Sequence, residues 1–209
     1  MVLKDRGFFR IDIEIAKSKD AFGVYNALKE NLIEINDFDK ISKEQRKYLE
    51  NRGFLRKEVD IKYYEELIED SKCDIYIAKN MDGDIIGFAS IHKNKYNIAD
   101  FRTTLDNLYT DHKEIEELLT SKEKEFAYLD QISIVPDYQR KGVGTAILNQ
   151  ILTNTVVPIV AFIVEVPLAN KASARWHEYN GFERAAKCDG IYKEKKFQWW
   201  IYIHWNYKY

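Results

Sequence analysis

FAYLDQISIVPDYQRKGVGTAILNQI, residues 126–151, reads as a strand, a tight loop and a helix in that order. Residues 126–135 are expected to form the strand. Residues 136–142 contain a proline and a glycine and are expected to form the loop, and 143–154 have the apolar spacing of a helix. Such a loop presents free backbone N–H groups and the positive end of a helix dipole, so it suits a phosphate group.

The loop residues favour an anion site of one particular kind. Gly142 and Gly144 have no Cβ to obstruct a close approach, and Arg140 and Lys141 add positive charge. A Walker A loop is excluded because no lysine follows Gly142, and a Rossmann fingerprint is excluded because Ile147 stands where its third glycine would be. The pattern that remains is Q-x-x-G-x-G directly after a strand.

The elements around this stretch alternate between strands and helices, and Gly181 is a typical helix end. Strands are expected over 9–15, 75–78, 84–91, 158–166, 182–187 and 197–207, and helices over 18–35, before 53, over 61–68, through 115–119 and over 170–179. This order predicts a mixed α/β fold with one parallel crossover in the middle. The polar segment 93–125 is long for a connection between strands, so we expect an elaborated surface element there.

Composition excludes several classes of protein. Hydrophobic residues make up 45% and charged residues 32% of the 209 residues, which argues against a disordered chain and a membrane protein. The net charge of −2 gives no general motive for binding nucleic acid. Residues 1–17 lack the apolar core of a signal peptide, so we expect a cytoplasmic protein. Cys73 and Cys188 do not have the spacing of a zinc site or a redox pair and are expected in the core.

Two motifs together resemble the GCN5-related N-acetyltransferase (GNAT) superfamily. Gln139–Gly144 resembles the family's acetyl-CoA pyrophosphate loop. The downstream pattern N-x-x-[AS]-x-x-[LFW]-[YH]-x-x-x-G-F is matched by Asn170, Ser173, Trp176, His177, Gly181 and Phe182. The branch that this sequence resembles most carries Tyr-Leu-Asp before the loop and Glu-Val before the asparagine, here Tyr128-Leu129-Asp130 and Glu165-Val166.

The resemblance extends over 75–207 and covers the first seventy residues only by element order. It implies a GNAT-type acyl-CoA N-acyltransferase fold of the α/β (mixed α+β) class. The central sheet is expected to be mixed and mostly antiparallel, with a splayed parallel pair, and to be flanked by helices. One domain over 1–209 follows. Its expected parts are an N-terminal strand with helices (1–74), a hairpin (75–92), an elaborated insertion (93–125), an acetyl-CoA-binding core (126–182) and C-terminal strands (183–209).

The resemblance implies acetyl-CoA as cosubstrate and no metal. Strand backbone would contact pantetheine and the acetyl carbonyl, with an N–H near Ile134 polarising the thioester. The amides of the loop would hold the pyrophosphate. The cofactor-binding residues expected from the family are Ile132, Ser133, Ile134, Gln139, Arg140, Lys141, Gly142, Val143, Gly144, Thr145, Asn170, Ser173 and His177.

Acetyl transfer to an amine needs a base, because a lysine-like amine with a pKa of about 10.4 is mostly protonated near neutral pH. Family members often place the base on the strand before the loop, where Tyr128 and Asp130 share a face. Asp130 is the first candidate, with ordering of a loop as its alternative role, and Glu165 is the second carboxylate. His177 stands where many members carry tyrosine, and it could protonate the leaving thiolate or serve packing.

Segment 93–125 lies where the family's acceptor pocket is usually walled, so Tyr96 and Phe101 are substrate-contact candidates, with simple packing as the alternative. The aromatic residues of 197–207 are expected in the core, or on an edge strand that forms a dimer face. Phe197, Trp199, Ile201, Ile203, Trp205 and Tyr207 share one face of that strand.

Two functions follow from the resemblance. The first is an acetyl-CoA-dependent N-acetyltransferase that transfers acetyl to a primary amine of a small molecule or peptide by direct attack on the thioester. The second is a non-catalytic protein that binds CoA or acetyl-CoA and has a regulatory role. No nucleic-acid or membrane partner is expected, and a homodimer is an open prediction.

Overall fold

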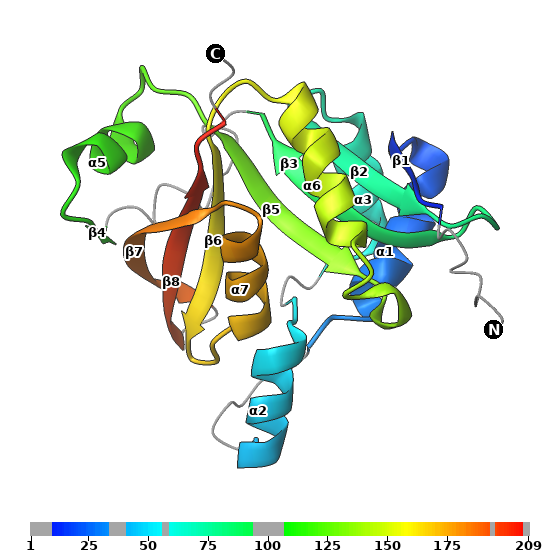
Figure 1. Cartoon of the computed structure of the whole chain (residues 1–209), viewed down its shortest axis with the longest axis horizontal. Coiled ribbons are helices and arrows are strands. Elements are labelled where there is room, and N and C mark those ends of the chain that lie inside the picture. Colours follow the sequence, from blue (N-terminus) through cyan, green and yellow to red (C-terminus); the bar gives the residue numbers. More distant parts are fainter. Residues whose placement is uncertain (1–9, 34–40, 56–58, 94–106, 193–194, 207–209) are drawn as a thin grey trace, which may run out of the picture.

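A computed structural model describes residues 10–33, 41–55, 59–93, 107–192 and 195–206 (Figure 1). Its centre is an eight-stranded sheet in the order β1-β2-β3-β5-β6-β8-β7-β4. Within the described residues, β5 and β6 are the one parallel pair and the other neighbours are antiparallel. The strands are β1 (Asp12–Ile15), β2 (Cys73–Lys79), β3 (Ile85–His92), β4 (Leu108–Tyr109), β5 (Ala127–Ile134), β6 (Ile159–Val166), β7 (Glu183–Tyr192) and β8 (Lys195–His204). The expected mixed, mostly antiparallel sheet is confirmed.

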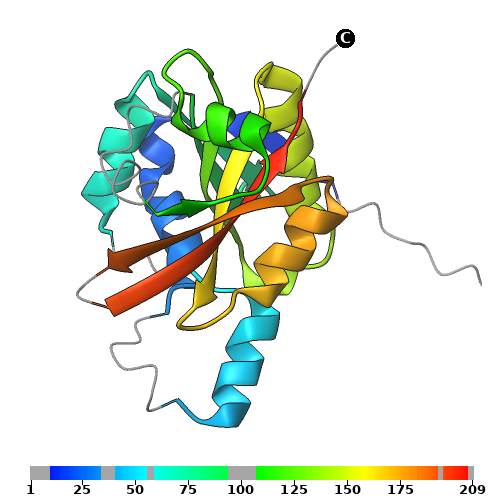
Figure 2. The same cartoon turned by 90° about the vertical axis from the view of Figure 1, so that its left-hand side faces the viewer.

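Helices cover both faces of the sheet. Figure 2 shows α6 and α7 on one side of it and α1 and α3 on the other. The α-helices are α1 (Ala21–Lys29), α2 (Lys43–Arg52), α3 (Ile61–Glu69), α5 (Lys113–Thr120), α6 (Val143–Asn154) and α7 (Lys171–Tyr179). Two short 3₁₀ turns, η1 (Ser18–Asp20) and η4 (Pro136–Tyr138), precede α1 and follow β5.

The alternation of side chains along the strands divides the core between the two faces. On the α6 side, Ile147 and Ile151 of α6 pack on Leu129 of β5 and on its neighbours. On the other side, α1 and α3 enclose Phe88 of β3. Helix α5 covers the β6–β8 end of that second face, where Leu119 packs on inward-pointing residues such as Ile201.

Strand β8 is an interior strand, which rules out the alternative that its aromatic residues lie on an edge strand. It pairs with β6 on one side and β7 on the other. Strand β8 lies between β6 and β7 and runs antiparallel to both. Its aromatic residues pack against the core on both faces of the sheet. Trp199 is partly buried beside Ile201, and Tyr202 is buried on the opposite face. The sheet edges are β1 and β4.

Helix α2 lies below α7 and projects away from the sheet (Figures 1 and 2). No side chain of this helix is buried. Polar contacts attach it to the beginning of α7 and the loop before it. Arg46 donates to the Pro167 carbonyl at 2.9 Å, and Lys171 forms an ion pair with Glu50 at 2.7 Å.

Several element boundaries agree with the sequence pattern. The helix expected over 143–154 has those bounds, and the helix through 115–119 is α5. The first strand is shorter than expected and begins at Asp12. The helix expected over 18–35 ends at Lys29, because residues 31–33 turn away to make a bridge between Leu32 and Leu55.

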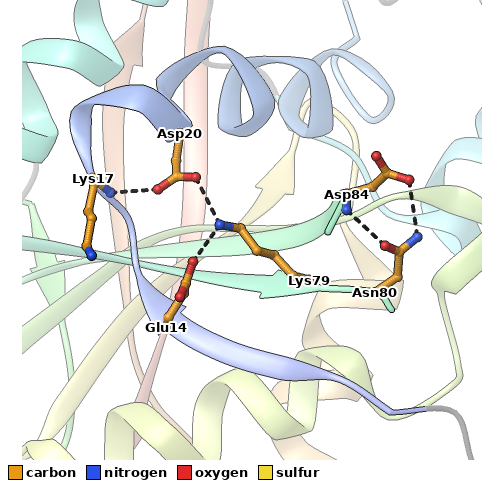
Figure 3. Close-up of polar contacts among 6 residues, drawn as sticks. All are labelled: Glu14, Lys17, Asp20, Lys79, Asn80 and Asp84. Carbon is orange, nitrogen blue, oxygen red and sulfur yellow. Dashed lines mark hydrogen bonds and ion pairs between the residues drawn. The ribbon is translucent and has the colours of Figure 1, made fainter. Parts of the chain in front are cut away.

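A buried ion pair fixes the beginning of α1 to the sheet (Figure 3). The Asp20 carboxylate accepts a hydrogen bond from the Lys17 backbone N–H at 2.9 Å and another from Lys79 Nζ at 3.0 Å. Lys79 also donates to Glu14 of β1. Burial alone would raise the pKa of Asp20, but the hydrogen bond from Lys17 and the contact with Lys79 outweigh it, so the pKa is lowered.

We expect Asp20→Asn to lower the free energy of unfolding by about 1–2 kcal/mol at pH 7, because it removes one charge from a largely buried pair. A carboxylate with a lowered folded-state pKa contributes stability above its unfolded value near 3.9 and loses that contribution as the pH falls through the folded value. Urea unfolding at pH 7 and at pH 3 measures the difference. An equal effect of the substitution at both pH values would contradict the ion-pair explanation.

Candidate functional site

The sheet opens between β5 and β6. Their parallel register covers three residue pairs, Ala127–Leu129 opposite Ile159–Ala161. Beyond Leu129, β5 continues to pair with β3, and β6 continues to pair with β8. A gap therefore opens in the middle of the sheet, with unpaired strand edges on its two sides. This is the splayed parallel pair that the sequence predicted.

The backbone of β5 faces this gap near Ile134. The N–H of Val135 donates to the Ile86 carbonyl of β3 at 2.9 Å. Because backbone polar groups alternate between the two edges of a strand, those of Ile134 point to the opposite edge. Side-chain amides of Asn31 and Gln139 donate to the Ile134 carbonyl at 2.9 and 3.1 Å. The carbonyl is thus occupied, and the Ile134 N–H is the group that faces the gap.

The loop between β5 and α6 is held in a fixed conformation at the end of this gap. The Gln139 side chain donates to Asn31 Oδ1 at 3.0 Å as well as to the strand. Arg140 and Gly142 both have positive φ, 59° and 85°. A Cβ on Gly142 would meet no atom within 4 Å, so its φ, and not crowding, explains the glycine. Arg140 and Lys141 are exposed beside it.

Gly144 has a packing role, and its predicted contact with a cofactor stays a prediction. A Cβ at this position would lie 3.1 Å from Nε1 of Trp176, so the missing side chain lets α6 approach α7. The next residue, Thr145, donates to Asn180 Oδ1 at the end of α7, at 2.9 Å. The first N–H groups of α6 have no acceptor within the helix. Packing of α6 on α7 thereby directs them toward the loop.

Asn170 and Ser173 shape the beginning of α7. The Asn170 side chain accepts from the Ser173 N–H at 3.2 Å and caps the helix. Its amide also donates to the Phe54 carbonyl at 2.9 Å. Both polar ends of Asn170 are therefore used within the protein, and its predicted contact with a cofactor stays a prediction.

Asp130 lies where the two strands separate. Ser90 of β3 is opposite Gln131 and Ile91 is opposite Leu129, so Asp130 is the extra residue of a β-bulge. A bulge re-aims side chains and often lies beside functional sites. The sequence predicted that Asp130 and Tyr128 share a face, and both indeed contact the same neighbour. Oδ2 of Asp130 is 3.8 Å from Nε2 of His92, and the His92 ring stacks on Tyr128.

The surroundings of Asp130 are polar and largely buried. The side chains of Asp130 and His92 are each 12% exposed. Burial raises the pKa of Tyr128 well above its ordinary value, and the negative charge of Asp130 raises it further. Tyr64 of α3 donates to Gln131 Oε1 at 2.6 Å, and burial raises its pKa also. Both tyrosines are therefore protonated near neutral pH.

His177 does not lie in a setting that suits an acid catalyst. It is 1% exposed and packs among Trp176, Phe182 and Tyr202. Its Nδ1 lies 2.8 Å from the Ser173 carbonyl. Burial lowers the pKa of His177 to about 4, so the imidazole is neutral at pH 7. We therefore assign this histidine to the packing of α7 and not to protonation of a leaving group.

Glu165 is not brought together with Asp130. It lines a cavity of about 280 Å³ that is bounded by α7 and β8. Its negative charge acts on Tyr202, which packs toward the α6 and α7 side of the sheet. Asp130, in contrast, contacts His92 and Tyr128, and Tyr128 packs under α5 on the other side. The two candidate carboxylates thus serve different regions.

The two substrate-contact candidates, Tyr96 and Phe101, lie outside the described residues. Tyr109, from the same segment, is in β4 and is 57% exposed. In the part of the chain that the structure describes, no group of three or more His, Cys, Asp or Glu side chains could hold a metal ion. Every helix in that part is too short or too polar to cross a bilayer.

The family model for the acetyltransferase (GNAT) family matches residues 36–182. The chain belongs to this family. The match spans the gap between β5 and β6, the loop and α7, so the GNAT assignment rests on the same region as the candidate site. Members of the family transfer acetyl groups, and acetyl transfer is the general activity that membership supports.

Solved GNAT structures resemble the whole chain. The ribosomal-protein-S18-alanine N-acetyltransferase of Escherichia coli has a TM-score of 0.58 and 14% identity, with 96% of each chain covered. Arabidopsis thaliana NAA60 bound to a bisubstrate analogue has a TM-score of 0.57 and 12% identity over 94% of this chain and 99% of that chain. An acetyltransferase of Thermus thermophilus has a TM-score of 0.53 and 13% identity, over 91% of this chain and 95% of that chain. No curated sequence matches significantly.

Sequence reasoning missed His92 and its neighbours Ser90 and Gln131. A signal was present, because Ser90 and His92 are two polar residues at two-residue spacing in the apolar strand IIGFASIH. The register that brings them against Asp130 comes from pairing of distant segments and from the bulge. Neither can be read from local periodicity.

His177 gives a stability prediction. A buried histidine with its pKa at about 4 stays neutral in the folded chain, while its unfolded form binds a proton below about 6.5. The unfolded state then gains protons on acidification, so stability falls between pH 7 and pH 5 by about 2 kcal/mol. Denaturant unfolding should show this loss in the wild type and much less of it in His177→Phe. The exposed His112→Gln should behave like the wild type, and a pH-independent difference would contradict the assignment.

Proposed function

We propose that the protein is an acetyl-CoA-dependent N-acetyltransferase that acetylates a primary amine of a small molecule or peptide. One observation carries the proposal: the gap between β5 and β6 has a fixed, glycine-containing helix N-terminus at one end and the Asp130 bulge at its closed end. An anion-binding end and a proton-accepting end on one gap are what this transfer needs.

The residues of the gap fit the chemistry of acetyl-CoA. The backbone N–H groups at the beginning of α6 suit a pyrophosphate, and the exposed Arg140 and Lys141 add positive charge there. The edge of β5 that carries Ile132 and Ile134 offers backbone groups for the amides of pantetheine. When bound, acetyl-CoA supplies an activated acetyl thioester, and the Ile134 N–H would polarise its carbonyl.

Asp130 is the proposed base. Its carboxylate would accept a proton from the ammonium form of the acceptor, which frees the nitrogen lone pair for attack. Tyr128 is protonated at neutral pH and is therefore a hydrogen-bond donor in this proposal, not a second base. Glu165 and His177 have no part in proton transfer here, because they lie in other surroundings.

The acceptor class is supported by the named relatives and by the charge at the site. The Escherichia coli relative is named for an alanine of ribosomal protein S18, and NAA60 is also known in complex with acetyl-CoA. A carboxylate at the closed end of the gap attracts a cationic amine. A cytoplasmic location and a homodimer are part of the same proposal.

Acetyl-CoA should stabilise the folded protein. At 100 times its Kd, a ligand adds about 2.7 kcal/mol to the free energy of unfolding, which raises the melting temperature by several degrees. Gly142→Ala should reduce that shift, since alanine is strained at φ 85° and the loop must change. Gly83→Ala is the matched control. Its φ is also 85° in open space, but it lies in the β2–β3 turn.

The control variant should lose stability like Gly142→Ala but keep the full shift with acetyl-CoA. Thermal melts with acetyl-CoA, free CoA and NADH make the comparison. Absence of any shift with either CoA compound would refute the cofactor assignment. An equal shift with NADH would show that the loop does not distinguish these ligands.

Asp130→Asn should lower the rate of acetyl transfer by about 10²–10⁴-fold, because the amide cannot accept the amine proton. Release of the CoA thiol with a panel of small amines and peptides measures the rate. Glu165→Gln is the matched control and should retain the rate.

If the wild-type protein acetylates none of these amines and peptides but binds acetyl-CoA normally, the non-catalytic CoA-binding alternative is favoured. Equal losses in Asp130→Asn and Glu165→Gln would contradict the choice of base.

A further inference from the structure

Two polar residues of β3 lie on the face of the sheet that carries α1 and α3. Phe88 packs with those helices, and Ser90 and His92 follow at two-residue spacing on the same face. Ser90 is fully buried, and the side chain of His92 is 12% exposed. Buried polar side chains in the middle of an apolar strand need hydrogen-bond partners or a function.

His92 contacts the proposed base directly. Its Nε2 lies 3.8 Å from Oδ2 of Asp130, an ion-pair distance that is slightly too long for a hydrogen bond. The ring stacks on Tyr128, with 6.0 Å between the centroids and 20° between the planes. The stack fixes the plane of the imidazole, so that Nε2 stays directed at the carboxylate. Hydrogen bonds between catalytic groups are often long before substrate binds.

Three polar side-chain atoms of this region are buried without a hydrogen-bond partner in the described part of the chain. His92 Nδ1, Ser90 Oγ and Gln131 Nε2 are buried and have no hydrogen-bond partner among the described residues. Ser90 is directly opposite Gln131 in the ladder, and His92 is two residues further along the same face. Ordered water typically satisfies such groups. An acceptor role for Nδ1 toward this region leaves the ring proton on Nε2, facing Asp130.

Among the groups around His92, Asp130 is the dominant charge. Tyr128 belongs to β5, Tyr63 and Tyr64 belong to α3, and Cys73 is opposite His92 on β2. Burial raises the pKa of Tyr128 and Tyr64, so these two rings are neutral near pH 7. The next residue, Lys93, pairs with Asp74 at 2.8 Å.

We propose that His92 is the positioning residue of the base: neutral His92 donates its Nε2–H to the Asp130 carboxylate and holds it toward the gap. This proposal rests on the proposed function. Each transfer converts an ammonium ion and a thioester into an amide, a thiol and one proton, which Asp130 accepts and then releases. Protonation of His92 places a positive charge beside Asp130 and weakens it as a base, so transfer slows as His92 becomes protonated.

Two substitutions separate the hydrogen bond from the titration. His92→Gln keeps an N–H donor near the Nε2 position but does not titrate. Its kcat should stay within a few-fold of the wild type at pH 8, and the acid limb of its pH–rate profile should move to lower pH. His92→Phe keeps a ring against Tyr128 but has no donor, and its kcat should fall by about 10- to 100-fold, with an unchanged melting shift from acetyl-CoA. The exposed His112→Gln serves as control.

Nitrogen NMR of the imidazole gives a readout that needs no turnover. In the wild-type protein at pH 8, the ring proton should be on Nε2, and Asp130→Ala should remove that preference. A proton on Nδ1 in the wild type, or the same tautomer in both proteins, would overturn the proposal. So would wild-type kcat and pH profile in His92→Phe. Failure of every amine to react, with the Nε2 tautomer present, would refute the proposed function and leave the His92–Asp130 pair established.

Discussion

The separation of β5 from β6 is the constraint on which the rest of the molecule depends. Three residue pairs join two halves of the sheet, and each half is then completed by antiparallel partners, β3 on one side and β8 on the other. Backbone groups left on the inner edges cannot be satisfied by a neighbouring strand. The side-chain amides of Asn31 and Gln139 satisfy one of them, and a ligand with amide groups suits the others.

Helices α6 and α7 pack closely against each other beside the gap between β5 and β6. Gly144 admits the indole of Trp176, and Thr145 reaches the end of α7 through Asn180. His177 fills the space under α7 among aromatic rings. Residues that a motif marks as cofactor-binding thus also carry the packing that aims the N-terminus of α6. Residues of such a family motif can therefore serve both packing and cofactor binding.

Local pattern was sufficient for much of the fold. Apolar spacing over 143–154 predicted α6, and the strand expected over 126–135 is β5, because both elements bury one face against the core. The interior position of β8 was not predicted, since strand order depends on pairing between distant segments. The same reason explains the site. The family resemblance pointed to Asp130 and Tyr128, on the strand before the loop, whereas His92 joins them across a ladder with a bulge. His177 was placed by motif, but its burial depends on Phe182, just before β7, and on Tyr202 of β8.

The contacts between α2 and the beginning of α7 have a thermodynamic consequence. Asn170 caps α7 with its oxygen and donates with its nitrogen to the carbonyl of Phe54, just after α2, while Lys171 of α7 pairs with Glu50 of α2. One side chain therefore takes part in two folding events. Whatever orders the first turn of α7 also lowers the free energy of the docked α2, and by linkage an interaction that holds α2 in place favours the ordered turn by an equal amount. Docking of α2 and ordering of the first turn of α7 are therefore coupled.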